Sequence, residues 1–147
     1  MSMSIYNRQR RLVGFDTGWL RRRAAVISTA AKIDESEACV LLVSNQRIHT
    51  LNLEWRGMDK PTDVLSFPQN EGDFADLHSD VLGDVVISLE QADQQRSERT
   101  LMDEVTHLLI HGVLHLLGHD HAEIEETRAM REEEERIWSV LRTVESE

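Results

Sequence analysis

The segment HGVLHLLGHDH, residues 111–121, holds four histidines in eleven positions. Such a cluster is not expected in a hydrophobic core, because burying several imidazoles together without hydrogen-bond partners has a large desolvation free energy. The segment closes a longer apolar run whose spacing predicts a helix from Ser97 to Gly118, where the glycine ends it. Something must organise these histidines, and a metal ion is the simplest candidate.

Three of the histidines share one face of the predicted helix. His107, His111 and His115 are each four residues apart, so neighbouring side chains lie only about 40° apart in projection. A pair with this spacing is a standard way to bind Zn²⁺, and a catalytic site needs a third protein ligand and an open position. Beyond the glycine turn, either His119 or His121 is placed to supply the third nitrogen.

The residue after the first of these ligands distinguishes the segment from a metalloprotease motif. In H-E-x-x-H the glutamate is the general base, whereas Gly112 stands at that position here and has no side chain to remove a proton. Peptide hydrolysis by that route is therefore disfavoured. The glycine is expected to let a substrate or another backbone approach the ion closely.

Three short segments have the composition of β-strands. EACVLLVS is a continuous apolar run at 37–44, and DVLSFP and VLGDVVIS follow at 63–68 and 81–88. Pro68 cannot donate a ladder hydrogen bond, so it ends its strand or confines it to a sheet edge. The polar, glycine-containing stretch at 69–80 is predicted to be a loop.

Helical periodicity marks the remaining long segments. The predicted helices are residues 16–31 capped by Asp16 or Thr17, residues 45–56 ending before Gly57, residues 97–118, and the C-terminal stretch 122–147. Too few strands are predicted for a doubly wound sheet. We therefore expect an α+β fold in a single domain over residues 1–147, with a small mixed sheet of about four strands and about five helices.

The charges are distributed unevenly along the chain. The formal net charge of −11 argues against general polyanion binding. Residues 1–32 nevertheless contain seven basic side chains and one acidic side chain. This cluster is either a solvated helix face or a surface that contacts phosphates. In the C-terminal segment the acids are expected to cover the solvent face, opposite an apolar stripe.

Composition also bears on the cellular setting. No apolar run reaches the roughly 20 residues of a membrane-spanning helix, and the N-terminal residues contain no signal-peptide core. Cys39 is the only cysteine, which excludes an internal disulfide. We expect a cytoplasmic protein without a membrane partner. His49 and His78 lie in a predicted helix and a polar loop, away from the cluster.

Three sequence blocks resemble those of the YbeY endoribonucleases, bacterial zinc proteins that process ribosomal RNA. HGVLHLLGHDH is similar to the family signature H-G-x-L-H-L-x-G-[YH]-D-H. LNLEWRGMDKPTDVLSFP at 51–68 is similar to a second block, and LGDVVIS at 82–88 to a third. The blocks stand in the family's order across residues 51–121, and together they form a highly specific match.

The resemblance implies a zincin-like metal-site helix and one Zn²⁺ per chain, held by His111, His115 and His121. His119 stands where tyrosine is common, whereas His121 matches the D-H pair. The resemblance also implies that Arg56 lies in the cleft with the catalytic histidines, and that the substrate is single-stranded RNA. No DNA substrate is expected.

The implied roles agree with the chemistry of these groups. A three-histidine zinc lowers the pKa of bound water and polarises a phosphoryl oxygen, and an arginine offers a bidentate donor to phosphate. Four further residues are candidates for orienting a ligand imidazole or lining the cleft: Asp120, Asp84, Ser66 and His107. Three groups remain candidates for the general base, namely a metal-activated water, His107 and the 2′-hydroxyl of the RNA.

The expected function is that of a zinc-dependent, single-strand-specific endoribonuclease in the maturation of the 3′ end of 16S rRNA and in ribosome quality control. Its expected partners are the rRNA precursor, the small ribosomal subunit and associated assembly proteins. One alternative is a metallohydrolase of another substrate. A second is a non-catalytic, zinc-containing assembly factor, which a closed four-ligand site with both His119 and His121 would favour.

Overall fold

The computed structural model describes residues 3–9, 14–33, 37–69, 81–120 and 122–147. Several features predicted above lie outside these ranges: Arg10, Arg11, His78, His121 and nearly all of the loop at 69–80.

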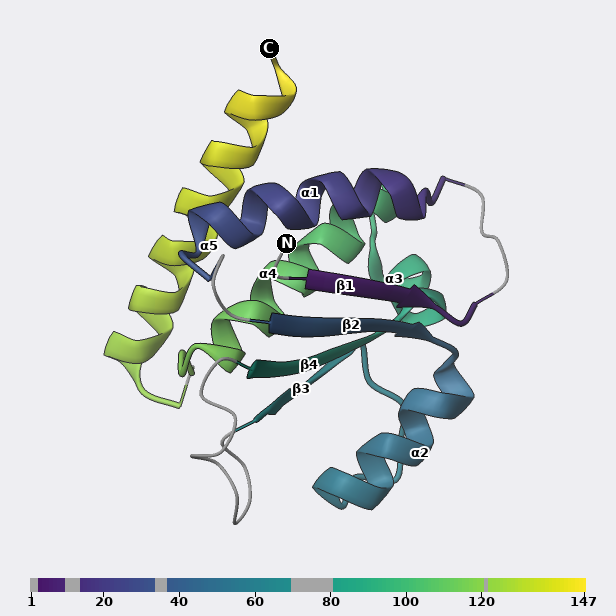
Figure 1. Cartoon of the computed structure of the whole chain (residues 1–147). Coiled ribbons are helices and arrows are strands. Elements are labelled where there is room, and N and C mark those ends of the chain that lie inside the picture. The colour runs from purple at the N-terminus through teal and green to yellow at the C-terminus, as the bar shows by residue number, and fades with distance from the viewer. Residues whose placement is uncertain (1–2, 10–13, 34–36, 70–80, 121) are drawn as a thin grey trace.

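A four-stranded mixed sheet forms the centre of the molecule (Figure 1), as the sequence predicted. Its order is β1-β2-β4-β3, with β1 at Met3–Asn7, β2 at Glu37–Val43, β3 at Val64–Pro68 and β4 at Val81–Ser88. The first three strands in this order run parallel, and β3 pairs antiparallel with β4 at the edge, where Pro68 is tolerated. Strand β1 was not predicted, because only Met3 and Ile5 of its five residues are buried and the others are polar or exposed.

Five helices are present in the described ranges: α1 at Thr17–Ala30, α2 at Asn45–Arg56, α3 at Leu89–Gln95, α4 at Leu101–Leu116 and α5 at Ile124–Glu145. Asp16 caps α1, because its carboxylate accepts the N–H of Trp19. Helix α2 ends at Gly57, whose φ of 71° is left-handed, as expected for a C-terminal glycine. None of these helices is long and apolar enough to span a bilayer.

The N-terminal part of the histidine-rich segment differs from the prediction. Helix α4 begins at Leu101 instead of Ser97, since Ser97 has a φ of 55° and the hydroxyl of Thr100 accepts the N–H of Asp103 as N-cap. The short helix α3, capped by Ser88, was not predicted because two turns carry little periodicity.

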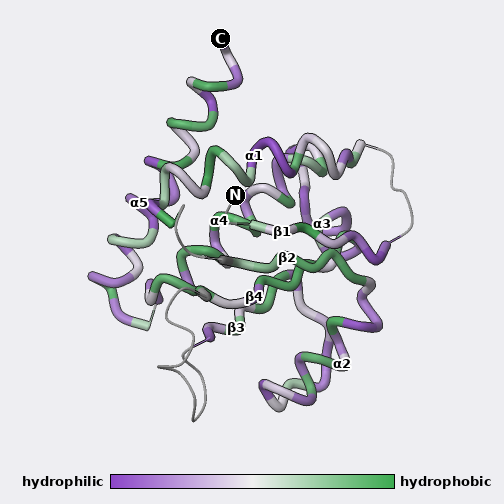
Figure 2. The backbone as a smooth tube through the Cα atoms, in the orientation of Figure 1, coloured by the Kyte–Doolittle hydropathy of each residue, from purple (hydrophilic) through white to green (hydrophobic). Residues whose placement is uncertain are grey.

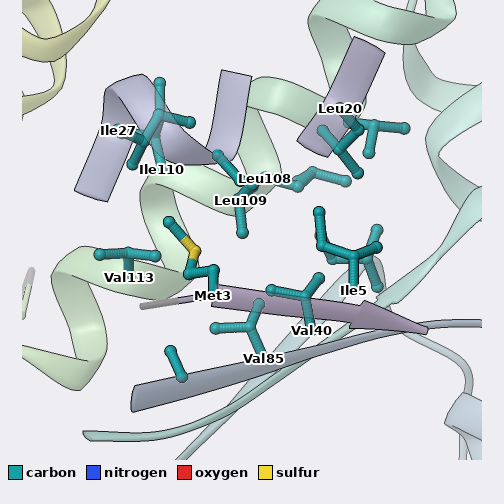
Figure 3. Packing of buried hydrophobic residues seen from close by; sticks show 14 of the residues in the cluster. Met3, Ile5, Leu20, Ile27, Val40, Val85, Leu108, Leu109, Ile110 and Val113 are labelled. Atoms are coloured by element: carbon teal, nitrogen blue, oxygen red, sulfur yellow. The ribbon is translucent and has the colours of Figure 1, made fainter. Parts of the chain in front are cut away.

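The helices lie on both sides of the sheet but unequally. Helices α1 and α4 cover one face, α5 packs against them, and α2 lies beyond the other face (Figure 1). Between α1, α4 and the sheet, side chains of both layers interdigitate, including Met3, Val40, Val85, Leu109 and Val113 (Figure 3). The central strand β2 is continuously hydrophobic after its first residue (Figure 2), whereas hydrophobic and hydrophilic residues alternate along α5.

Gly112 allows α4 to pack closely on β4. A Cβ atom at this position would lie 2.6 Å from Cγ1 of Val85 and 3.3 Å from Oγ of Ser66. The group that approaches Gly112 is therefore a side chain of the sheet. The sequence had instead predicted a substrate or another backbone at this position. The close packing brings the histidine face of α4 down to the edge strand β3.

Candidate active site

The regular turn of α4 gathers the three histidines, as their spacing predicted. The ring centroids of His107 and His111 are 6.3 Å apart, and those of His111 and His115 are 4.6 Å apart. All three side chains are half-buried. Nε2 of His115 lies 3.0 Å from Nε2 of His111, so two imidazole nitrogens converge on the same point.

The contact between His111 and Glu134 is compatible with a metal ligand at His111. Nδ1 of His111 lies 3.0 Å from Oε1 of Glu134, so the neutral ring carries its proton on Nδ1, donates it to the carboxylate and leaves the Nε2 lone pair toward His115. Two nitrogens bound tetrahedrally to one zinc ion at about 2.0–2.1 Å would be about 3.3 Å apart. The observed separation is close to this value, and carboxylate-bound imidazole is the usual form of a zinc ligand.

Glu134 is a functional candidate that sequence reasoning assigned to the solvent face of the C-terminal helix. In the structure its side chain is only 18% exposed and faces His111. The hydrogen bond from His111 holds the pKa of the Glu134 carboxyl below its usual range. Its position was a usable signal, because Met130, Glu134, Ile137 and Leu141 follow the 4-3-4 spacing of one helix face.

Replacing Glu134 by alanine is expected to weaken binding of a divalent ion at the histidine pair by about 10- to 100-fold. The substitution frees the His111 ring to rotate and to shift its proton between the two nitrogens. Competition with a chromophoric zinc chelator measures the effect. Glu132→Ala, an exposed acid on the same helix, is the control, and equal affinities in the two variants would contradict the assignment.

The chain turns at the end of α4. Gly118 adopts a φ of 96°, its N–H donates to the carbonyl of His115, and the N–H of His119 donates to the carbonyl of Leu114. His119 is half-buried and Asp120 is exposed. Among the described residues no group of three or more His, Cys, Asp or Glu side chains is arranged to hold a metal ion, and the expected third ligand His121 falls outside them.

The histidine pair opens into a groove of about 500 Å³, called here the histidine groove. It is lined by Arg56, Asp63, Val64, Leu65, Ser66, Pro68, His111 and His115. Ser66 faces α4 and donates its hydroxyl to the carbonyl of Gly112 at 3.1 Å. The structure thus brings Ser66 and Arg56 to the same groove as two of the expected zinc ligands.

Arg56, the last residue of α2, is held over the edge strand. One Nη donates to the carbonyl of Ser66 at 2.8 Å and the other to the carbonyl of Trp55 at 3.3 Å. Its guanidinium carbon lies 4.8 Å from the ring centroid of Phe67, within cation–π range. These contacts orient the guanidinium before any ligand binds.

A second cavity of about 810 Å³ continues from the histidine groove toward the α3–α4 turn and shares Asp63, Val64 and His111 with it. His107 lines this cavity. Its Nδ1 atom is buried and has no hydrogen-bond partner among the described residues. Burial lowers the pKa of His107 below its ordinary value, which favours the neutral imidazole.

Two other predicted features lie away from this groove. Val85 faces α4, so Asp84 points to the opposite face of the sheet, where burial raises the pKa of its carboxyl. In the N-terminal basic cluster, Arg23 is 5% exposed and is paired with Glu145 and Asp103. That arginine is a buried structural group and not a phosphate-binding one.

Comparison with known proteins agrees with this geometry. The family model described as Endoribonuclease YbeY matches residues 6–142. Proteins named Endoribonuclease YbeY are similar over much or nearly all of the chain. The protein from Geobacter sulfurreducens is 39% identical with 96% of both chains covered, and that from Syntrophus aciditrophicus is 36% identical with 96% of this chain and 90% of the relative covered. The protein from Carboxydothermus hydrogenoformans is 56% identical over 69% of this chain and 70% of its own.

The fold has a counterpart among solved structures. The solution structure of TM1509 from Thermotoga maritima superposes with a TM-score of 0.60 at 26% sequence identity, covering 96% of this chain and 92% of the other. The family match covers most of the chain and includes the histidine pair, Arg56 and the edge strand. The resemblance seen in the sequence is thereby confirmed, and the chain belongs to the endoribonuclease YbeY family.

Proposed function

We propose that the chain, acting as one domain over residues 1–147, is a zinc-dependent endoribonuclease whose active site is the histidine groove. The convergence of the two Nε2 atoms of His111 and His115, 3.0 Å apart beside Arg56, carries this proposal. His121 would complete a three-histidine set for one ion. When bound, zinc would supply an activated water and a Lewis acid for a phosphoryl oxygen.

The protein's own side chains have distinct tasks in this proposal. Glu134 keeps the proton of His111 on Nδ1, so that Nε2 stays available as a ligand. Arg56 offers a planar donor pair to a phosphate whose negative charge grows in the transition state. Ser66 accepts the Arg56 guanidinium on its carbonyl and holds α4 through its hydroxyl, which fixes the distance between the arginine and the histidines.

The proposed substrate is single-stranded RNA, and the proposed setting is maturation of the 3′ end of 16S rRNA on the small ribosomal subunit. The relatives' name supports the RNA class. The charge supports a substrate delivered by a partner, because a net charge of −11 gives little general attraction for polyanions. Assembled small-subunit precursors would present the single strand to the groove without requiring a broad basic surface.

Arg56→Ala is the variant that tests the phosphate-binding part of the proposal. We expect kcat for cleavage of a single-stranded RNA oligonucleotide to fall by about 100-fold, as when one oxyanion donor is lost, while zinc affinity is unchanged. Arg56→Lys keeps the positive charge but loses the planar pair of N–H donors, so it should recover only part of the cleavage rate. The zinc-loaded parent and variants, purified in parallel, are compared by gel electrophoresis of labelled RNA. Equal kcat values would exclude Arg56 from the chemistry.

A further inference from the structure

A second groove lies on the face of the sheet away from α4, between α2 and strands β2, β4 and β3. Its volume is about 540 Å³, and we call it the aromatic groove. It is lined by Leu41, Val43, Arg47, Leu51, Trp55, Phe67, Pro68, Gln69, Asp84 and Val86. No task in the proposed chemistry uses this groove, yet its size is within the range of small-ligand sites.

Two aromatic rings stand at one side of the groove. Trp55 is 59% exposed although it is the largest side-chain type, and Phe67 is half-buried beside it. Their centroids are 6.2 Å apart with an interplanar angle of 72°, an edge-to-face pair that leaves ring surface uncovered. Exposed aromatic surface of this kind beside a groove indicates a ligand with a flat apolar face.

The aromatic groove meets the histidine groove at the edge strand. Pro68 lines both grooves. Arg56 lines the histidine groove, while its guanidinium lies over the ring of Phe67, which lines the aromatic groove. A ligand with a phosphate at Arg56 therefore has an aromatic surface within reach on the other side of β3.

Polar groups accompany the rings. Asp84 is the direct cross-strand partner of Phe67 and lines the aromatic groove, and Arg47 lines it from α2. One carboxyl and one guanidinium provide an acceptor and donors for the edge of a heterocycle. Rings for stacking together with a few edge-reading groups are what single-stranded RNA sites use to hold an unstacked base.

We propose that the aromatic groove binds the base of the RNA nucleotide adjacent to the cleaved phosphodiester, with Trp55 and Phe67 as its stacking surface. The inference rests on the proposed function and adds to it a base-binding site on the opposite face of the sheet. It also explains a requirement for single strands, because a base within a duplex is stacked and paired and cannot cross the edge strand into this groove.

The test is binding of a single-stranded 2′-O-methyl oligonucleotide to the zinc-loaded full chain, measured by fluorescence anisotropy. Gel electrophoresis of the oligonucleotide after the measurement checks that it is still intact. Trp55→Ala is expected to raise Kd about 10-fold or more. Trp55→Phe, which keeps a ring, should recover most of the affinity. Leu53→Ala is the matched control, since Leu53 is 49% exposed on the same helix and lines neither groove.

Oligonucleotides with one abasic position separate base stacking from a general effect on the fold. For the parent protein one abasic position should cost about as much as Trp55→Ala does. Trp55→Ala should then lose no further affinity for the abasic strand, because the stacking contact is already absent when either the base or the indole ring is removed. Two results would overturn the inference: Trp55→Ala weakens binding of the intact and abasic strands by the same factor, or Trp55→Ala and Leu53→Ala give equal Kd values. The aromatic groove would then be a candidate site for a protein partner.

The outcome is separable from that of the proposed function. If the zinc-loaded parent fails to cleave RNA but shows the expected binding pattern, the base site stands and the nuclease proposal fails. If the parent cleaves RNA and Trp55→Ala changes neither Kd nor KM, the nuclease proposal stands and the base site fails. Thermal unfolding of each variant confirms that the comparison is made between folded proteins.

Discussion

His115→Ala is expected to abolish zinc-dependent cleavage of single-stranded RNA while leaving the protein folded. The substitution removes one of the two nitrogens that converge at 3.0 Å, and the ion would keep only His111 within the described residues. A metal ion is worth several kcal/mol to the transition state of phosphoryl transfer, which corresponds to a loss of roughly 1,000-fold in rate. Stability should change little, because His115 lines a groove and is only half-buried.

Two quantities are measured for each protein: the initial rate of RNA cleavage, and the amount of zinc bound per chain, which metal analysis after dialysis determines. His49→Ala is the matched control, because His49 is a partly buried histidine of α2 that pairs with Asp59 at 2.7 Å and lines neither groove. If His115→Ala loses both bound zinc and cleavage while His49→Ala keeps both, the reaction takes place at His111 and His115. Equal cleavage by the parent and both variants would reveal a contaminating ribonuclease and remove the support for the proposal.

Arg23→Ala is expected to lower the free energy of unfolding by about 3 kcal/mol. Arg23 is 5% exposed and binds Glu145 through Nε and Nη2, at 2.8 and 2.9 Å. Its remaining nitrogen binds Asp103 and the hydroxyl of Thr106, both at 2.8 Å. The cost lies at the lower end of the range for a broken buried ion pair, because both carboxylates reach solvent and regain hydration.

Thermal denaturation should show this loss as a fall in Tm of about 10 °C for a domain of this size. Arg22→Ala, an exposed neighbour on α1, serves as the control and should shift Tm by little. A Tm for Arg23→Ala within one or two degrees of the parent would show that the cluster does not hold α5 in place.

The same cluster also predicts the direction of a pH effect. The hydrogen bond from Arg23 lowers the pKa of the Glu145 carboxyl below its ordinary value of 4.5. A depressed carboxyl pKa stabilises the folded state fully at pH values well above 4.5 and loses this contribution as the pH falls through the lower, folded-state pKa. The difference in stability between the parent and Arg23→Ala should therefore narrow in acid.

Local patterns in the sequence determined most of the secondary structure and the placement of the histidines in the proposed active site. The four-residue spacing of His107, His111 and His115 places them on one face of any α-helix, whatever surrounds it. Gly57 and Gly118 end their helices because the left-handed conformation is open to glycine. Pro68 confined its strand to an edge for the equally local reason that it lacks an N–H.

Other features were decided by packing between segments far apart in the chain. Glu134 reaches His111 because α5 packs against α4, and the acidic run around it looks like a solvated surface when read alone. Asp84 lies away from the histidines because Val85 fills the space under Gly112, and alternation along a strand then sends its neighbour to the other face.

Tertiary structure alone also gave the arginines their separate roles. Arg23 is buried between α1, α4 and α5, whereas Arg56 is held over β3 by the carbonyl of Ser66 and the ring of Phe67. The sequence by itself determined which side chains each helix and strand presents together, because dihedral periodicity is a short-range property. Which of these faces meet depends on the burial of apolar surface across the whole domain, and only the packed sheet and helices decide it.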